Sequence, residues 1–311
     1  MINFRYHVVS LTAVFLALAI GLVVGTAALN GPVADQLQTQ IVALNKDNNN
    51  KRDQITQYRE ELNRSQGFAT EIAPTVLGGR LAGRKLLVLT LPDTDAYADG
   101  VISMLQVAGA TVTAKVTINE KFLDPNNSIE MLDLAGQSSQ PTIQLEGLPV
   151  NSDGVETASA QLALTLLQRT GTTQAAAADV KAVLTAYSKQ GYIAVDDKAA
   201  GGAEATVVVS GAPAVDKSAA QKSQNAVTLA TQFSRNKAMV VAGDGVGDGN
   251  LISAVRGDPT LVKAISTVDN ASTVNGQVAA GMTCVERFVQ DKVGQYGLAA
   301  GSSSMMPKAA A

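Results

Sequence analysis

The chain has 311 residues, a formal net charge of −3, one histidine and one cysteine. Without an excess of basic residues, no nucleic-acid partner is expected. The lone cysteine, Cys284, excludes an intramolecular disulfide, and the lone histidine, His7, leaves the rest of the chain without the usual imidazole acid–base group.

The first predicted element is an apolar helix. Residues 8–29 contain no charged side chain. As a helix they would span roughly 33 Å, close to a hydrocarbon core of about 30 Å. We therefore expect residues 1–32 to be a retained membrane anchor, because a secretory signal has a shorter apolar region. The small residues Thr26, Ala27 and Ala28 keep cleavage open as the alternative.

The flanking charges predict the orientation of this helix. Arg5 precedes it, and Asp35 is the first charged residue after it. This asymmetry predicts a cytoplasmic N-terminus and an extracytoplasmic C-terminal domain, in a periplasm-like space. A single spanning helix favours the inner membrane over the outer one.

Residues 33–74 are predicted to form a second, amphipathic helix. Its 4-3 spacing indicates a coiled-coil seam, and Asn48 at an a position would fix the register of a parallel pair. We expect a homodimer through this segment. The alternative is a single helix that packs on its own globular domain. The seam positions are Leu37, Ile41, Leu44, Asn48, Lys51, Ile55, Tyr58, Leu62, Ser65, Ala69 and Ile72.

Residues 84–296 are predicted to alternate between strands and helices, which indicates a Rossmann-like α/β sandwich with a mostly parallel sheet. Residues 124–148 are expected to be a loop with a short helix, and residues 297–311 a disordered tail. The predicted strands are 84–92, 110–118, 192–195, 205–210, 237–243 and 263–269. The predicted helices are 95–108, 158–169, 173–189, 218–235, 251–256 and 273–293.

The glycine-rich segment GDGVGDGN, residues 243–250, lies where a dinucleotide fingerprint would occur. Asp248 replaces the required third glycine, and Asp244 and Asp248 would repel a pyrophosphate. Calcium is an alternative, but further acidic ligands are missing. We favour a structural turn with a helix-capping aspartate.

No catalytic or cofactor-binding residues are expected. Asp93 and Asp95 follow the first strand, at the usual ligand edge of a parallel sheet, but no histidine is available to form a nucleophile–base pair. Helix capping is the favoured role for these two residues.

The weak candidates for a metal site are Met282 and Cys284, because a thioether and a thiolate suit Cu(I). Two positions apart on a helix, they would point about 200° away from each other. A role in the hydrophobic core is therefore favoured. Met305 and Met306 are adjacent in the predicted tail.

Several segments resemble the actinobacterial copper transporter family, whose members include mycobacterial MctB and corynebacterial SteB. They are FRYHVVSLTAVFLALAIGLVVG (4–25), the coil after it, KLLVLTLP (85–92), and ISTVDNASTVNGQVAAGMTCVERFVQDKVGQYG (265–297). The resemblance runs in order along the whole chain.

This resemblance implies a role in copper transport or homeostasis, with copper as a transported or sensed ion. The corynebacterial branch implies another role, as the partner of a second membrane protein, SteA, in regulating a peptidoglycan hydrolase during cell separation. Neither implies catalytic residues. Because the apolar helix offers no polar lining for a pore, the residues favour a non-catalytic, dimeric interaction scaffold of the cell envelope.

Overall fold

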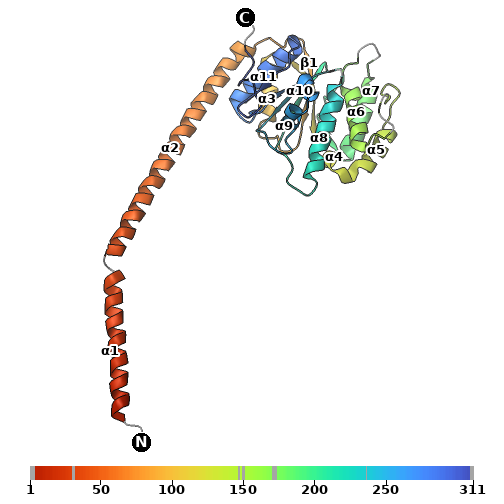
Figure 1. The fold of residues 1–311 in the computed structure, drawn as a ribbon. Helices are drawn as coiled ribbons and strands as arrows, with labels where there is room; N and C mark the ends of the chain where they lie inside the picture. Colours follow the sequence, from red (N-terminus) through yellow and green to blue (C-terminus); the bar gives the residue numbers. More distant parts are fainter. Residues whose placement is uncertain are drawn as a thin grey trace. The chain divides into compact units, whose positions relative to one another are not determined.

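The computed structural model describes residues 4–29, 32–145, 148, 151–169, 174–235 and 237–308. The chain divides into two compact units, Met1–Arg64 and Ser65–Ala311. Figure 1 follows the chain through both, from α1 (Phe4–Leu29) and α2 (Pro32–Leu77) to the C-terminal elements.

The N-terminal apolar helix is confirmed. Within Phe4–Ala27 of α1, an 18-residue window has a mean hydropathy of 2.6, and none of this window is buried. The hydroxyls of Thr12 and Thr26 donate to the carbonyls of Val8 and Leu22, at 2.6 and 2.9 Å. These bonds satisfy the two threonine hydroxyls, and the length and composition of the helix suit a membrane span.

Helix α2 continues past Pro74, where the sequence predicts its end, and stops at Leu77. Packing explains the extension, because Ala73 and Leu77 on the last turns are buried in the second unit. The amide of Gly78 then donates to the carbonyl of Pro74 at 2.9 Å and closes the helix. Residues 65–77 therefore pack on the chain's own globular unit, which was the alternative for the whole segment.

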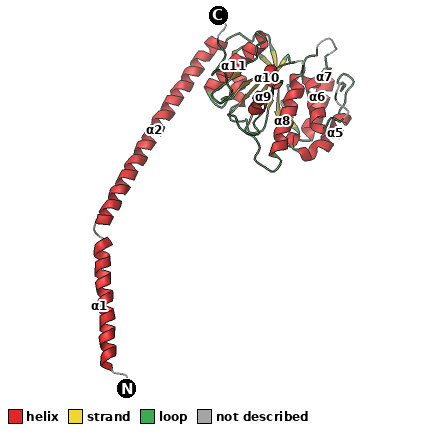
Figure 2. Ribbon diagram, in the orientation of Figure 1, coloured by secondary structure: helices red, strands yellow, loops and turns green. Residues whose placement is uncertain are grey.

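The second unit contains a seven-stranded sheet with the order β3-β2-β1-β4-β5-β6-β7. All neighbouring strands are parallel except β2 and β3. The predicted α/β class with a mostly parallel sheet is thus confirmed, with helices around the strands (Figure 2). The strands are β1 (Lys85–Thr90), β2 (Thr111–Ile118), β3 (Ile193–Val195), β4 (Ala205–Ser210), β5 (Ala238–Gly243), β6 (Ile265–Val268) and β7 (Gln295–Tyr296).

Two hydrophobic clusters cover the two faces of this sheet. In β1, Leu86 and Val88 join one cluster, whereas Leu87 and Leu89 join the other. This division follows from the period-2 alternation of side chains in a strand. The first cluster includes α3 (Ala98–Val107), α11 (Val274–Val289) and the end of α2. The second includes α6 (Gly154–Leu166), α7 (Ala177–Lys189) and α8 (Ala219–Ser234).

Short helices fill the remaining connections. The predicted loop at 124–148 contains α5 (Ser128–Gln137), which buries Met131 and Ala135. Helix α11 ends at Val289, four residues before its predicted end, because Asp291 adopts a left-handed φ of 53°. The others are α4 (Glu120–Leu123), the 3-10 turn η1 (Pro125–Asn127), α9 (Leu251–Gly257) and α10 (Leu261–Ala264).

Residues 297–308 are attached to the sheet by hydrogen bonds, whereas the sequence predicts disorder there. The amide of Gly297 donates to Ser304 O at 3.0 Å, and the amide of Leu298 donates to Asp269 Oδ1 at 2.7 Å. Gly297 has a φ of +130°, and a Cβ at this position would lie 2.1 Å from Asp269 Oδ1. Only glycine permits this approach. Residues 309–311 of the predicted tail lie outside the described residues.

Candidate functional site

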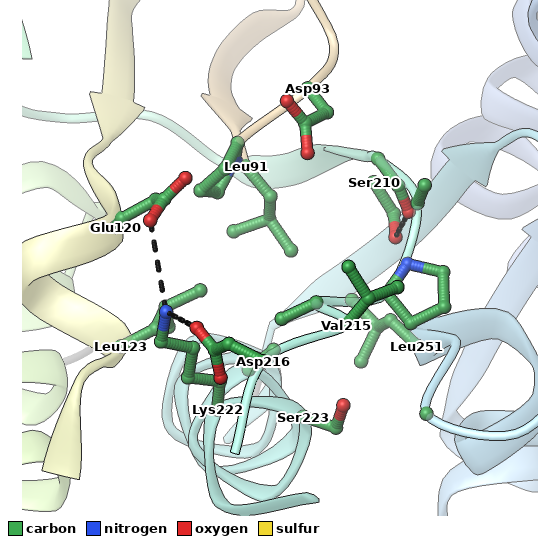
Figure 3. A pocket seen from close by; sticks show the side chains of 17 residues that line it. Leu91, Asp93, Glu120, Leu123, Ser210, Val215, Asp216, Lys222, Ser223 and Leu251 are labelled. Carbon is green, nitrogen blue, oxygen red and sulfur yellow. Dashed lines mark hydrogen bonds and ion pairs between the residues drawn. The ribbon is translucent and has the colours of Figure 1, made fainter. Parts of the chain in front are cut away.

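A cavity of about 230 Å³ opens beyond the carboxyl ends of β1 and β4 (Figure 3). In the sheet, β1 lies between β2 and β4. The strand order runs from β1 to β2 in one direction and from β4 to β7 in the other, so the cavity lies where the order reverses. Ligands of open parallel sheets bind in this crevice. Its apolar lining includes Leu91, Leu123 and Leu251.

The backbone around this cavity is tightly packed. Asp93 has a left-handed φ of 61°. A Cβ on Gly211 would lie 2.0 Å from the carbonyl oxygen of Pro92, so the loops after β1 and β4 touch through their backbones. The Tyr97 hydroxyl donates to Ser210 O at 2.6 Å and ties the start of α3 to the end of β4. Burial and, secondarily, the charges of Asp244 and Asp93 raise the pKa of Tyr97 to about 12, so this donor stays protonated.

Lys222 is the basic group of the cavity, and carboxylates neutralise it. Its Nζ lies 2.5 Å from Asp216 Oδ2 and 3.7 Å from Glu120 Oε2 (Figure 3). The hydrogen bond with Asp216 raises the pKa of Lys222 and lowers the pKa of Asp216. Lys222 is therefore a protonated, paired cation and not a nucleophile. With Asp93 also in the lining, the cavity disfavours a phosphate ligand.

Asp93 and Asp95 do not cap the helix that follows them. Helix α3 has Tyr97 at its N-cap, without a side-chain hydrogen bond. The preceding turn is instead held by the Thr94 hydroxyl, which donates to Leu91 O at 2.8 Å. The helix-capping role expected for the two aspartates is wrong, because their loop turns sharply at Asp93 before the helix begins.

The glycine-rich segment 243–250 is a structural turn, as expected, but its cap is not an aspartate. Asn250 Oδ1 accepts from the amide of Ile252 at 2.8 Å and caps α9. Asp244 accepts from the Ser272 hydroxyl at 2.6 Å. Over the described residues, no three His, Cys, Asp or Glu side chains are grouped to hold a metal ion. The calcium alternative gains no support from this arrangement.

The structure separates the two metal candidates, Met282 and Cys284. Cys284 is fully buried in the cluster between the sheet and α11, and burial raises the pKa of its thiol, which opposes thiolate formation. Met282 is half-buried and lines a groove with Met305 and Met306. Sequence reasoning missed this grouping because it treated residues after Gly297 as mobile.

Comparisons with known proteins agree with the resemblance seen in the sequence. The model of the family described as "Copper transport outer membrane protein, MctB" matches residues 1–307. The proteins named copper transporter MctB of Mycobacterium tuberculosis and Mycobacterium bovis are each 27% identical over 315 residues, covering 98% of this chain and 99% of theirs. The Mycobacterium leprae protein of that name is 27% identical over 324 residues, with the same coverage. The chain belongs to the MctB copper transport family.

Proposed function

We propose that this member of the MctB copper transport family is a non-catalytic membrane scaffold that acts in copper homeostasis as a parallel homodimer. In this proposal α1 anchors the chain with its N-terminus in the cytoplasm, and the α/β unit lies outside. Family membership supports the link to copper, and the apolar α1 supports the anchor. The paired Lys222 in the cavity at the ends of β1 and β4 supports a role without catalysis.

The observation that carries the dimer is an apolar stripe on α2 that no other described part of the single chain covers. Six of its residues in the first unit remain about half exposed or more. A helix in water gains most of its stability by burying an apolar face, so a stripe of this length indicates a partner helix. The exposed fractions are 53% for Leu37, 57% for Ile41, 67% for Leu44, 50% for Ile55, 68% for Tyr58 and 48% for Leu62.

The apolar helix α1 supports an anchor better than a conducting pore. Its hydroxyls at Thr12 and Thr26 donate to the helix backbone, so they are not free to replace the hydration shell of an ion. A selective pore needs polar groups that line the path. We therefore propose that the protein supports copper transport without conducting copper through its own helix.

Cysteine cross-linking in the membrane tests the parallel dimer. In a parallel coil, identical d positions face each other, so Leu44→Cys should form a disulfide-linked dimer. Lys46→Cys, at the outward f position of the same turn, is the matched control. The native Cys284 is buried, which keeps the background low. Equal cross-linking at both positions, or none at position 44, would contradict the dimer.

Copper content tests the physiological role. A strain without the gene should show altered copper content and sensitivity, and the full-length gene should restore both. Complementation by the double variant Ile41→Asp/Leu62→Asp should fail if dimerisation matters, whereas Thr39→Asp, at an f position, should restore the phenotype. Unchanged copper content in the null strain would contradict a role in copper homeostasis.

Membrane fractionation with protease digestion of a C-terminal tag tests the topology. The family description names the outer membrane. We propose the inner membrane, because a single apolar helix of this length suits a lipid bilayer while outer-membrane proteins are typically barrels. The tag should fractionate with inner membranes and be digested only after the outer permeability barrier is opened. A tag protected in intact inner-membrane spheroplasts would contradict the proposed orientation.

A second candidate function is supported by the polar centre of the coil. Asn48 and Lys51 occupy seam positions, and Lys51 pairs with Asp47 at 2.8 Å in the exposed helix. Polar seam residues weaken self-pairing and favour exchange with another coil. The chain would then bind a SteA-like membrane protein and regulate a peptidoglycan hydrolase during cell separation. A null strain with normal copper but chained cells, together with capture of both partners, would favour this function.

A further inference from the structure

We propose that Met282, Met305 and Met306 form a Cu(I)-binding site on the α/β unit. This inference rests on the proposed role in copper homeostasis and gives that role a specific location. The site is a groove of about 630 Å³ in the second unit, between the last turns of α2, one face of α11 and residues 305–308. Phe68, Ile72 and Val278 supply much of its apolar wall.

The methionines in the described part of the chain divide into two groups. The chain contains seven methionines. Met104, Met131 and Met239 are in the hydrophobic core, with exposed fractions of 8%, 0% and 0%. The other three in the described part of the chain, Met282, Met305 and Met306, all line the same groove. Residues far apart in the sequence thus bring three thioethers to one surface.

The backbone that carries Met305 and Met306 is held in place. The amide of Ser303 donates to Gln295 O at 2.7 Å, beside β7. The hydroxyl of Ser304 donates to Met306 O at 2.8 Å, across the methionine pair. Met282 projects from α11, which is packed on the sheet. Ligands on fixed backbone lose less conformational freedom when they bind a metal ion.

The chemistry of the groove selects the metal. Thioethers are soft, neutral ligands that favour Cu(I). Among the described lining residues the single charged side chain is Lys308, and no carboxylate is present. Calcium and magnesium, which need several oxygen ligands, are therefore disfavoured. Cys284 does not line the groove, so the coordination we propose uses thioethers without a thiolate and needs no redox step.

Competition with a coloured Cu(I) chelator tests the site on the full chain in detergent, with ascorbate to keep copper reduced. The wild type should take Cu(I) from the chelator. Met282→Leu/Met305→Leu/Met306→Leu keeps the apolar volume but removes the sulfurs. It should weaken binding by more than roughly 100-fold, because even outer-shell partners of metal ligands contribute about 10- to 100-fold. Met239→Leu, which removes a core thioether, is the matched control and should bind as the wild type does.

NMR of methyl-labelled methionine identifies the ligands directly. Cu(I) should shift the methyl signals of Met282, Met305 and Met306 and leave those of Met131 and Met239 in place. X-ray absorption of the bound copper should show sulfur neighbours. Leu44→Cys cross-linking on the triple-leucine background reports dimerisation independently of copper binding, so loss of this site is distinguishable from failure of the dimer.

Three results would overturn the site. The triple variant could bind Cu(I) as tightly as the wild type, or the folded wild type could fail to compete with the chelator. The third is an NMR result in which the methyl signals of Met282, Met305 and Met306 do not shift with Cu(I) but shift when Ile41→Asp/Leu62→Asp disrupts the dimer. That result would show that a second copy of the chain covers the groove.

Discussion

Arg256 and Asp269 form an ion pair in the interior of the α/β unit, with 2.8 Å between Nη1 and Oδ2 and side-chain exposures of 7% and 1%. The same guanidinium donates to Tyr296 O at 2.7 Å and to Ala300 O at 3.1 Å. Asp269 accepts from the amide of Leu298. One buried pair therefore joins β6 to the C-terminal segment that carries Met305 and Met306.

Replacing Asp269 by Asn should destabilise the α/β unit. The substitution keeps the shape but leaves the Arg256 guanidinium buried without its counter-charge, a loss of about 3–5 kcal/mol in typical cases. The free energy of unfolding can be measured by pulse proteolysis in urea on the detergent-solubilised protein. Hydrogen exchange should also rise at residues 298–304, because two of their amides lose their carboxylate acceptor.

The control for this prediction is Asp99→Asn. Asp99 pairs with Lys115 at 2.8 Å but is 82% exposed, and exposed pairs contribute about 0–1 kcal/mol. If Asp269→Asn costs no more than Asp99→Asn, the buried pair does not hold the C-terminal segment.

The sequence predicted the order of helices and strands well, because hydrophobic periodicity reports burial. The run at residues 86–89 is apolar on both faces, and both faces of β1 are in fact covered at these positions. The order of the C-terminal segment was not predicted, because it does not depend on the burial of apolar side chains. Residues 297–308 have few large apolar side chains, and their order depends on hydrogen bonds to Arg256 and Asp269 from distant positions. Local composition contains no signal for such contacts.

Replacing Asn48 by Ile should strengthen the proposed coil and loosen its specificity. A buried isoleucine contributes roughly 1.5–3 kcal/mol, while the polar pair that fixes register and oligomer state is lost. Sedimentation should then reveal species larger than dimers, and cross-linking through Leu44→Cys should become less selective. Asn49→Ile, at the outward b position, should change neither. Identical behaviour of the two variants would contradict a seam at Asn48.

Replacing Gly211 by Ala should destabilise the wall of the switch-point cavity. The new Cβ would lie 2.0 Å from Pro92 O, and a backbone atom cannot move aside cheaply. Overpacking of this kind costs about 1–3 kcal/mol, measurable by pulse proteolysis. Gly136→Ala is the control, because nothing lies within 4 Å of its Cβ and it is in helix α5, where alanine stabilises by about 0.5–1 kcal/mol. An unchanged stability of Gly211→Ala would show that the two loops separate easily.

The location of the cavity follows from the sheet topology, but its charge does not. Asp93 falls after a predicted strand and was a candidate on that basis. Lys222 and Asp216 come from the start of α8 and the loop before it, and their pairing depends on how this loop folds over β4. The separation of Met282 from Cys284 was anticipated from the helical period of 3.6. The grouping of Met305 with Met282 in one groove was not predicted, because it depends on how residues 297–308 fold back onto the α/β unit.

Cys284 should make stability fall at alkaline pH. Burial raises the pKa of its thiol above the usual 9.0, so the unfolded chain ionises first. The thiol's contribution is then complete below pH 9 and is lost above it, by about 1.4 kcal/mol per pH unit until the folded thiol also titrates. Comparison of the wild type with Cys284→Ala at about pH 8 and about pH 10 isolates this slope from that of the tyrosines. An iodoacetamide reaction as fast at Cys284 as at an introduced Lys46→Cys would contradict the burial on which this prediction depends.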